Sequence, residues 1–126
     1  MIWIVDDDNE MSGAMRLMLR VMDYESLTFS NARKAAEALL TGRQPDMLLL
    51  DINMPEVSGL DLLEFVRRRP EWNHLPVLML STESSDVTVD QALGLGADGY
   101  VTKPVTMEEL GRAMSSALQK HQKGIR

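Results

Sequence analysis

The stretch LLLDINMP, residues 48–55, is an apolar run that ends at a carboxylate. A run of leucines is typical of a strand buried on both faces of a sheet, because a half-buried strand would alternate polar and apolar residues. Asp51 is therefore expected at the end of a buried strand that covers MLLL (47–50), where a charge needs a partner. Four further runs are expected to be strands: IWIV (2–5), SLTF (26–29), VLML (77–80) and GYVT (99–102).

Helical patterns separate these runs. The segment after Ser30 and Asn31, either of which suits a helix cap, carries apolar residues at helical spacing and stops at Gly42. In the last segment Thr106 and Glu109 have the spacing of a capping box. Three other helices are expected over about 9–23, 58–68 and 86–95.

This alternation gives five β/α units, which indicates a parallel sheet covered by helices on both faces. With right-handed crossovers the expected fold is a doubly wound α/β sandwich, with five parallel strands in the flavodoxin-like order 2-1-3-4-5 and five helices. Ligands of such sheets bind beyond the carboxyl ends of the strands, where the strand order reverses. With 126 residues and no repeats or linkers, residues 1–126 are expected to form a single domain.

The composition narrows the function classes. With no cysteine the chain has no disulfide and no thiolate site, and no apolar stretch approaches the roughly 20 residues of a membrane span. No signal peptide precedes the first strand, so we expect a cytoplasmic location. The net charge of −6 argues against direct nucleic-acid binding. The basic runs RRR (67–69) and KHQKGIR (120–126) are expected to be solvated helix and chain ends.

Polar residues follow all four strong strands: Asp6, Asp7 and Asp8 the first, Asp51 the third, Ser81 and Thr82 the fourth, Lys103 and Pro104 the fifth. Asp7 or Asp8 alone could be a helix cap and Asp51 alone a turn residue, but that does not explain four polar strand ends. In the expected strand order Asp6 and Asp7 lie beside Asp51, and two charges about 4 Å apart repel by roughly 4 kcal/mol at an effective dielectric of about 20. Lys103 supplies one cation. Mg²⁺, with Mn²⁺ as the alternative, suits the remaining oxygen ligands.

A carboxylate beside a bound divalent cation can act as a nucleophile toward phosphorus. Asp51 is the candidate phosphoryl acceptor. Lys103 and the Ser81 hydroxyl are expected to hold the other phosphoryl oxygens, so that catalysis consists of positioning and electrostatics.

At these residues the chain resembles the receiver domain of bacterial two-component response regulators. Four segments resemble the family's motifs in order and spacing: IWIVDDD (2–8), LLLDINMPEVSG (48–59), PVLMLSTE (76–83) and GADGYVTKP (96–104). The resemblance implies that Asp51 accepts a phosphoryl group from a sensor histidine kinase or a histidine phosphotransfer protein. It also implies that Asp7, Asp51 and the Asn53 carbonyl ligate Mg²⁺, with Asp6 contributing through water.

The resemblance further implies a switch rather than a metabolic enzyme. Ser81 would turn toward the phosphoryl group and Tyr100 would move inward, changing the face formed by the fourth helix, fifth strand and fifth helix. An output domain or protein, or a second copy of the chain in a phosphorylation-dependent homodimer, would read that face. Thr82 is expected to narrow access to Asp51, and the peptide bond before Pro104 is expected to be cis.

Two other interpretations stay open. A haloacid-dehalogenase-like phosphatase would use Asp6 as its nucleophile in a D-x-D with Asp8, although Asn9 and Glu10 replace the Gly-Thr expected next. A phosphate-independent binding module would be expected to lack some of the acids or the lysine. The segment GLGADG (94–99) has the spacing of a dinucleotide-binding fingerprint, but it leaves a helix and enters a strand, which is the wrong context.

Overall fold

The computed structural model describes residues 1–83 and 85–124. Over these residues the strands are β1 (Ile2–Val5), β2 (Ser26–Phe29), β3 (Met47–Asp51), β4 (Val77–Ser81) and β5 (Gly99–Thr102). The helices are α1 (Asn9–Val21), α2 (Ala32–Leu40), α3 (Gly59–Arg67), α4 (Asp86–Gly94) and α5 (Met107–Gly124), with a short 3-10 helix, η1 (Pro70–Trp72). None of the helices in the described part of the chain combines the length and the hydrophobicity of a membrane-spanning segment.

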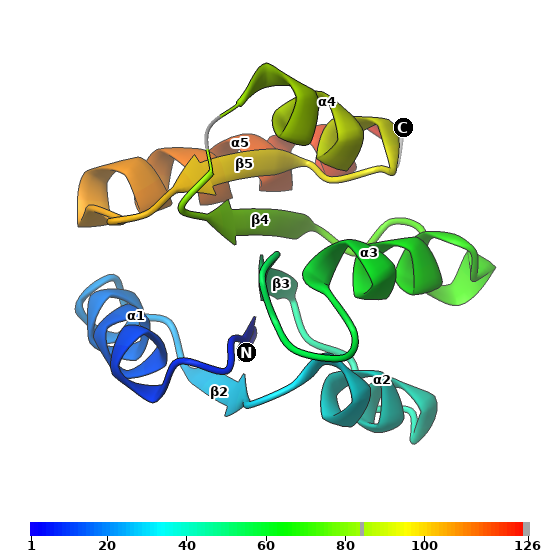
Figure 1. The fold of residues 1–126 in the computed structure, drawn as a ribbon, viewed down its shortest axis with the longest axis horizontal. Helices are drawn as coiled ribbons and strands as arrows, with labels where there is room; N and C mark the ends of the chain where they lie inside the picture. Colours follow the sequence, from blue (N-terminus) through cyan, green and yellow to red (C-terminus); the bar gives the residue numbers. More distant parts are fainter. Residues whose placement is uncertain (84, 125–126) are drawn as a thin grey trace.

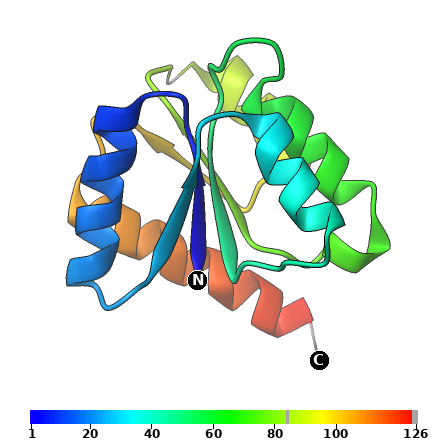
Figure 2. The same cartoon turned by 90° about the horizontal axis from the view of Figure 1, so that it is seen from below.

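The strands form one parallel sheet in the order β2-β1-β3-β4-β5, so the predicted fold class is confirmed. Helices cover both faces (Figure 1). Figure 2 shows α1 and α5 on one side of the sheet and α2 and α3 on the other. The strand order reverses between β1 and β3, which places the carboxyl ends of these two strands side by side.

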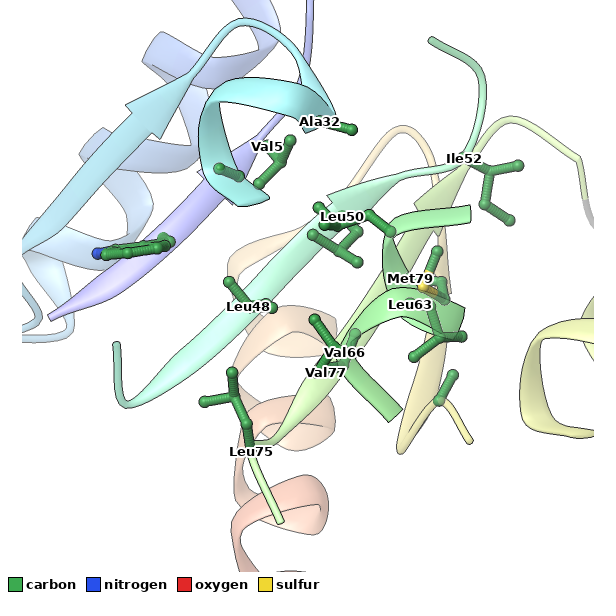
Figure 3. Close-up of a cluster of buried hydrophobic side chains, with 14 of the residues drawn as sticks. Val5, Ala32, Leu48, Leu50, Ile52, Leu63, Val66, Leu75, Val77 and Met79 are labelled. Atoms are coloured by element: carbon green, nitrogen blue, oxygen red, sulfur yellow. The ribbon is translucent and has the colours of Figure 1, made fainter. Parts of the chain in front are cut away.

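The central strands are buried throughout because both faces of the sheet are covered. Side chains of β3 and β4 alternate between two apolar clusters: Leu48, Leu50 and Met79 face α2 and α3, whereas Leu49 and Leu78 face α1 and α5. Figure 3 shows the first cluster. Since burying a leucine side chain stabilises a fold by about 1.5–3 kcal/mol, these rows anchor the strand ends that carry the polar residues.

Helix ends follow the local capping chemistry. Asn31, not Ser30, caps α2, because its side-chain oxygen accepts a hydrogen bond from the Lys34 N–H at 2.9 Å. Thr106 accepts one from the Glu109 N–H at 3.1 Å, as the capping-box spacing predicts. The predicted helix bounds agree with the structure to within two residues, the range over which helix ends commonly fray.

One expectation about the basic runs is wrong. Arg67 is not solvated: its side chain is 14% exposed, and its Nη2 lies 3.0 Å from the Asp98 carboxylate. Its Nε also donates to the Gly96 carbonyl at 2.8 Å. His121, in the second run, lies with Nε2 2.8 Å from the same carboxylate. The Arg67 side chain is buried because the turn before β5 packs against it and because its Nη1 donates to the Trp72 carbonyl of η1 at 3.2 Å, which the local sequence does not reveal.

Candidate functional site

The strand register brings the predicted polar residues to one edge of the sheet. Val5 pairs with Leu50, so Asp6, which follows β1, lies beside Asp51 at the end of β3. On the other side of β3, the Lys103 N–H donates to the Ser81 carbonyl at 2.7 Å, which joins the ends of β4 and β5. Four strand ends therefore meet at the point where the strand order reverses.

Asp6, Asp7 and Asp51 form an acidic cluster, with one carboxylate oxygen of each within 4.8 Å of the others. Asp6 and Asp51 are buried, and Asp7 is exposed. Buried carboxylates at this separation need a cation to offset their repulsion. Three oxygen donors with an open side toward solvent fit a hard divalent ion such as Mg²⁺, which keeps several of its waters.

Lys103 supplies a cation within the protein. Its Nζ lies 3.1 Å from Asp6 Oδ2 and 3.2 Å from Asp51 Oδ1, and its side chain is only 10% exposed. Burial by itself would lower the pKa of Lys103, but the hydrogen bonds and charges of Asp6 and Asp51 outweigh burial and raise it. The ammonium group is therefore held in its charged form between the two acids.

The surroundings of Asp51, in contrast, disfavour its charged form. Burial, followed by the charge of Asp6, raises the pKa of Asp51 above its ordinary value of 3.8, and Lys103 offsets this only in part. The ionised carboxylate is thus short of positive charge even with Lys103 in place. A further cation at the acidic cluster would favour the ionised, nucleophilic form.

Two of the three acids that follow β1 have distinct structural roles. Asp8 caps α1, accepting hydrogen bonds from the N–H groups of Glu10 at 3.0 Å and Met11 at 3.2 Å. Asp6 accepts the Asp8 N–H through Oδ1 at 2.9 Å, which leaves Oδ2 for Lys103. The interpretation of an acid here as a helix cap therefore holds for Asp8.

The predicted switch residues are linked through Glu83, a residue that the sequence did not single out for this role. Ser81 is fully buried, and its Oγ accepts the Glu83 N–H at 3.0 Å. Tyr100 is half-buried and donates its hydroxyl to the Glu83 carbonyl at 2.8 Å. Thr82 and Asn53 are exposed beside the site. The Lys103–Pro104 peptide bond is cis, the form that the resemblance implies.

Gly59 is a second residue whose importance the sequence did not show. A β-carbon at this position would lie 2.1 Å from the Asp51 carbonyl oxygen. Its N–H donates to the Ile52 carbonyl at 3.1 Å. The start of α3 therefore packs directly against the backbone of the candidate phosphoryl acceptor.

Comparisons with known proteins identify the family of the chain. The family model for the response regulator receiver domain matches residues 2–115. The transcriptional regulatory protein KdpE of Mycobacterium tuberculosis is 36% identical over 96% of this chain and 52% of its own length. The chemotaxis protein CheY of Pseudomonas aeruginosa is 35% identical over 86% of this chain and 88% of its own length.

The fold agrees. The structure of the chemotaxis response regulator CheY4 of Vibrio cholerae is 28% identical, with a TM-score of 0.83 over 92% of this chain and 96% of that one. The chain spans about half the length, or less, of several of the relatives that it matches. These similarities do not support a haloacid-dehalogenase-like phosphatase. By sequence and by fold, the chain belongs to the receiver domain family of two-component response regulators.

Proposed function

We propose that Asp51 is the phosphoryl acceptor of this receiver domain, and that the donor is a phosphohistidine on a sensor kinase or a histidine phosphotransfer protein. Receiver domains act as signalling switches, bind Mg²⁺ at an acidic pocket, and work with histidine kinases and output domains. The observation that carries the proposal is the Asp51 carboxylate, buried at a strand end beside two further acids and 3.2 Å from the Lys103 ammonium.

The residues of the chain divide the chemistry among them. An Asp51 carboxylate oxygen attacks phosphorus, the O–P bond forms, and the P–N bond to the donor imidazole breaks with its electron pair returning to nitrogen. Lys103 holds phosphoryl oxygens, and the Ser81 hydroxyl turns to donate to another. The exposed Thr82 borders the approach to Asp51.

The metal site fits the same scheme. Asp7, Asp51 and the Asn53 carbonyl would hold Mg²⁺ or Mn²⁺, with Asp6 contributing through water. A bound ion would supply charge neutralisation between the acids and the incoming phosphoryl group.

The output is proposed to be a population shift. Movement of Ser81 toward the phosphoryl group favours one position of Tyr100, which changes the surface formed by α4, β5 and α5. A downstream domain or protein, or a second copy of the chain, reads this surface. The net charge of −6 supports protein partners rather than nucleic acid. We propose that residues 1–126 form one phospho-accepting domain.

Labelling with acetyl phosphate in Mg²⁺ tests the proposal. Intact mass spectrometry should show one added phosphoryl group on the wild-type chain and none on Asp51→Asn. The matched control is Asp90→Asn, a change at an exposed acid on α4, which should label like the wild type. Label that survives Asp51→Asn but is lost in Asp6→Asn would contradict the proposal and point to a phosphatase-type nucleophile.

A further inference from the structure

Glu83 joins three elements because each of its polar groups is engaged. Its N–H donates to Ser81 Oγ at 3.0 Å, at the end of β4. Its carbonyl accepts the Tyr100 hydroxyl of β5 at 2.8 Å. Its carboxylate accepts the Thr88 hydroxyl of α4 at 3.0 Å. A single residue thus connects the candidate phosphorylation site, the tyrosine and the fourth helix.

The Thr88 hydroxyl is fixed on both sides. It accepts a hydrogen bond from Ser85 Oγ at 2.9 Å while it donates its one proton to Glu83. The Thr88 N–H donates back to Ser85 Oγ at 3.3 Å, so Ser85 caps α4. This chain of hydrogen bonds from Ser85 through Thr88 gives the Glu83 carboxylate a defined position although the residue is exposed.

We propose that Thr88 is a positioning residue that fixes Glu83 and thereby couples Ser81 and Tyr100 to the start of α4. The hydrogen bonds to Thr88 and Tyr100 require the same placement of Glu83, so breaking one lowers the population of the other. The regulatory meaning of this coupling rests on the proposed phosphorylation of Asp51.

The direction of the coupling follows from the contacts. Ser81 Oγ accepts the Glu83 N–H, so a Ser81 hydroxyl that turns toward a phosphoryl group gives up this hydrogen bond and releases Glu83. Glu83 then changes its contacts with Tyr100 and with Thr88 together. Because Thr88 lies in the first turn of α4, the signal enters that helix at its amino end.

Replacing Thr88 tests the coupling without any phosphorylation. Thr88→Val keeps the shape of the side chain but removes the hydroxyl, and Thr88→Ser keeps the hydroxyl. The readout is fluorine NMR, at slightly acidic pH, of protein labelled with 3-fluorotyrosine. The chain has two tyrosines, Tyr24 and Tyr100, so Tyr24→Phe assigns both signals.

In Thr88→Val the Tyr100 signal should move toward its position in the urea-unfolded chain. The expected fall in the ratio of Tyr100 hydrogen-bonded to Glu83 over free Tyr100 is about five-fold, the effect of losing one ordinary, exposed hydrogen bond. Thr88→Ser should restore the wild-type position. A cycle with Ser81→Ala should show non-additive shifts, because both changes act through Glu83.

A Tyr100 signal that stays at its wild-type position in Thr88→Val would overturn the coupling, even if the melting temperature falls, because a cap of α4 alone would affect only stability. Additive shifts with Ser81→Ala would overturn it as well. Labelling of Asp51 by acetyl phosphate is measured separately. If that labelling fails while the fluorine response is as expected, the proposed function fails and the coupling stands.

Discussion

At the scale of single residues, Asp51 carries a charge that its surroundings only partly offset. Burial and the neighbouring Asp6 disfavour ionisation, while Lys103 favours it, and the net effect is a raised pKa. A carboxylate in this state binds a proton or a metal ion more readily than one on the surface. The same imbalance that disfavours the free anion therefore prepares the site for a cation.

Asp51→Asn should make the metal-free protein more stable at neutral pH. Because the folded chain holds the Asp51 proton more tightly than the unfolded chain, this residue's contribution to stability falls as the pH rises from 3.8 to its raised pKa. The asparagine variant lacks this loss. Urea unfolding in a chelator, at a series of pH values, should show that the difference in free energy of unfolding between the two proteins grows through this range and stays large above it.

Adding Mg²⁺ should stabilise the wild type more than Asp51→Asn and narrow this gap, since the variant has lost a ligand. A variant that is less stable than the wild type at neutral pH in chelator would contradict the account of the charges.

Lys103→Met should destabilise the metal-free protein by about 3 kcal/mol, because it leaves Asp6 and Asp51 buried without their cation. The ammonium lies 3.1 and 3.2 Å from the two carboxylates. Urea unfolding measures the loss, and Mg²⁺ should recover part of it. Lys34→Met, at an exposed lysine on α2, is the control and should change little. Equal losses in the two variants would rule out a specific charge effect.

How well a residue's role could be predicted at this scale depended on residue type. Asp6, Asp51 and Lys103 could be predicted because a charged residue directly after a buried strand is costly unless it meets an opposite charge or a ligand. The buried ion pair of Arg67 and the linking role of Glu83 could not, because their partners come from elements distant in the sequence or from backbone atoms. Residue type shows what a side chain can do, whereas the fold decides what it meets.

At the scale of elements, the central strands could be predicted closely because burial on both faces leaves a continuous apolar run. The cap of α2 could not be chosen between Ser30 and Asn31, since both residue types suit the position. Backbone conformation decides it: Asn31 is extended, with a φ of −153° and a ψ of 162°, as a cap requires. The close approach of Gly59 to the Asp51 backbone likewise depends on a tertiary contact that no periodicity reports.

Gly59→Ala should disturb both stability and phosphorylation. The added methyl group would lie 2.1 Å from the Asp51 carbonyl oxygen, which is backbone and cannot rotate away. Overpacking of this kind costs about 1–3 kcal/mol, and the shift needed to relieve it moves Asp51 itself. The midpoint temperature of thermal unfolding and the rate of labelling by acetyl phosphate should therefore both fall.

Gly13→Ala is the matched control for this effect. Gly13 lies in α1 with nothing within 4 Å of the added β-carbon, so the change should stabilise the chain by up to about 1 kcal/mol. If Gly59→Ala behaved in the same way, the close packing of α3 on Asp51 would be disproved.

At the scale of the whole molecule, two clusters of charged residues lie at opposite ends of the parallel strands. The acids and Lys103 lie at the carboxyl ends of the strands. Asp98, just before β5, lies at the amino ends and accepts hydrogen bonds from the Val77 N–H at 2.9 Å and Arg67 Nη2 at 3.0 Å. The five residues of β4 join the two ends. At about 3.3 Å per residue, the clusters are about 13–16 Å apart.

This separation predicts that stability can be changed at Asp98 without changing the chemistry at Asp51. Asp98→Ala leaves the Arg67 guanidinium, 14% exposed, without its carboxylate, and removes the acceptor of the Val77 N–H. The expected loss is about 3–5 kcal/mol by urea unfolding. At temperatures where the variant stays folded, labelling by acetyl phosphate should keep the wild-type rate, because sites this far apart without shared partners act independently.

Arg67→Met in the Asp98→Ala background should recover stability, since it removes the unpaired charge. A labelling rate that falls in proportion to stability, or no recovery in the double variant, would show instead that the two ends of the sheet are coupled.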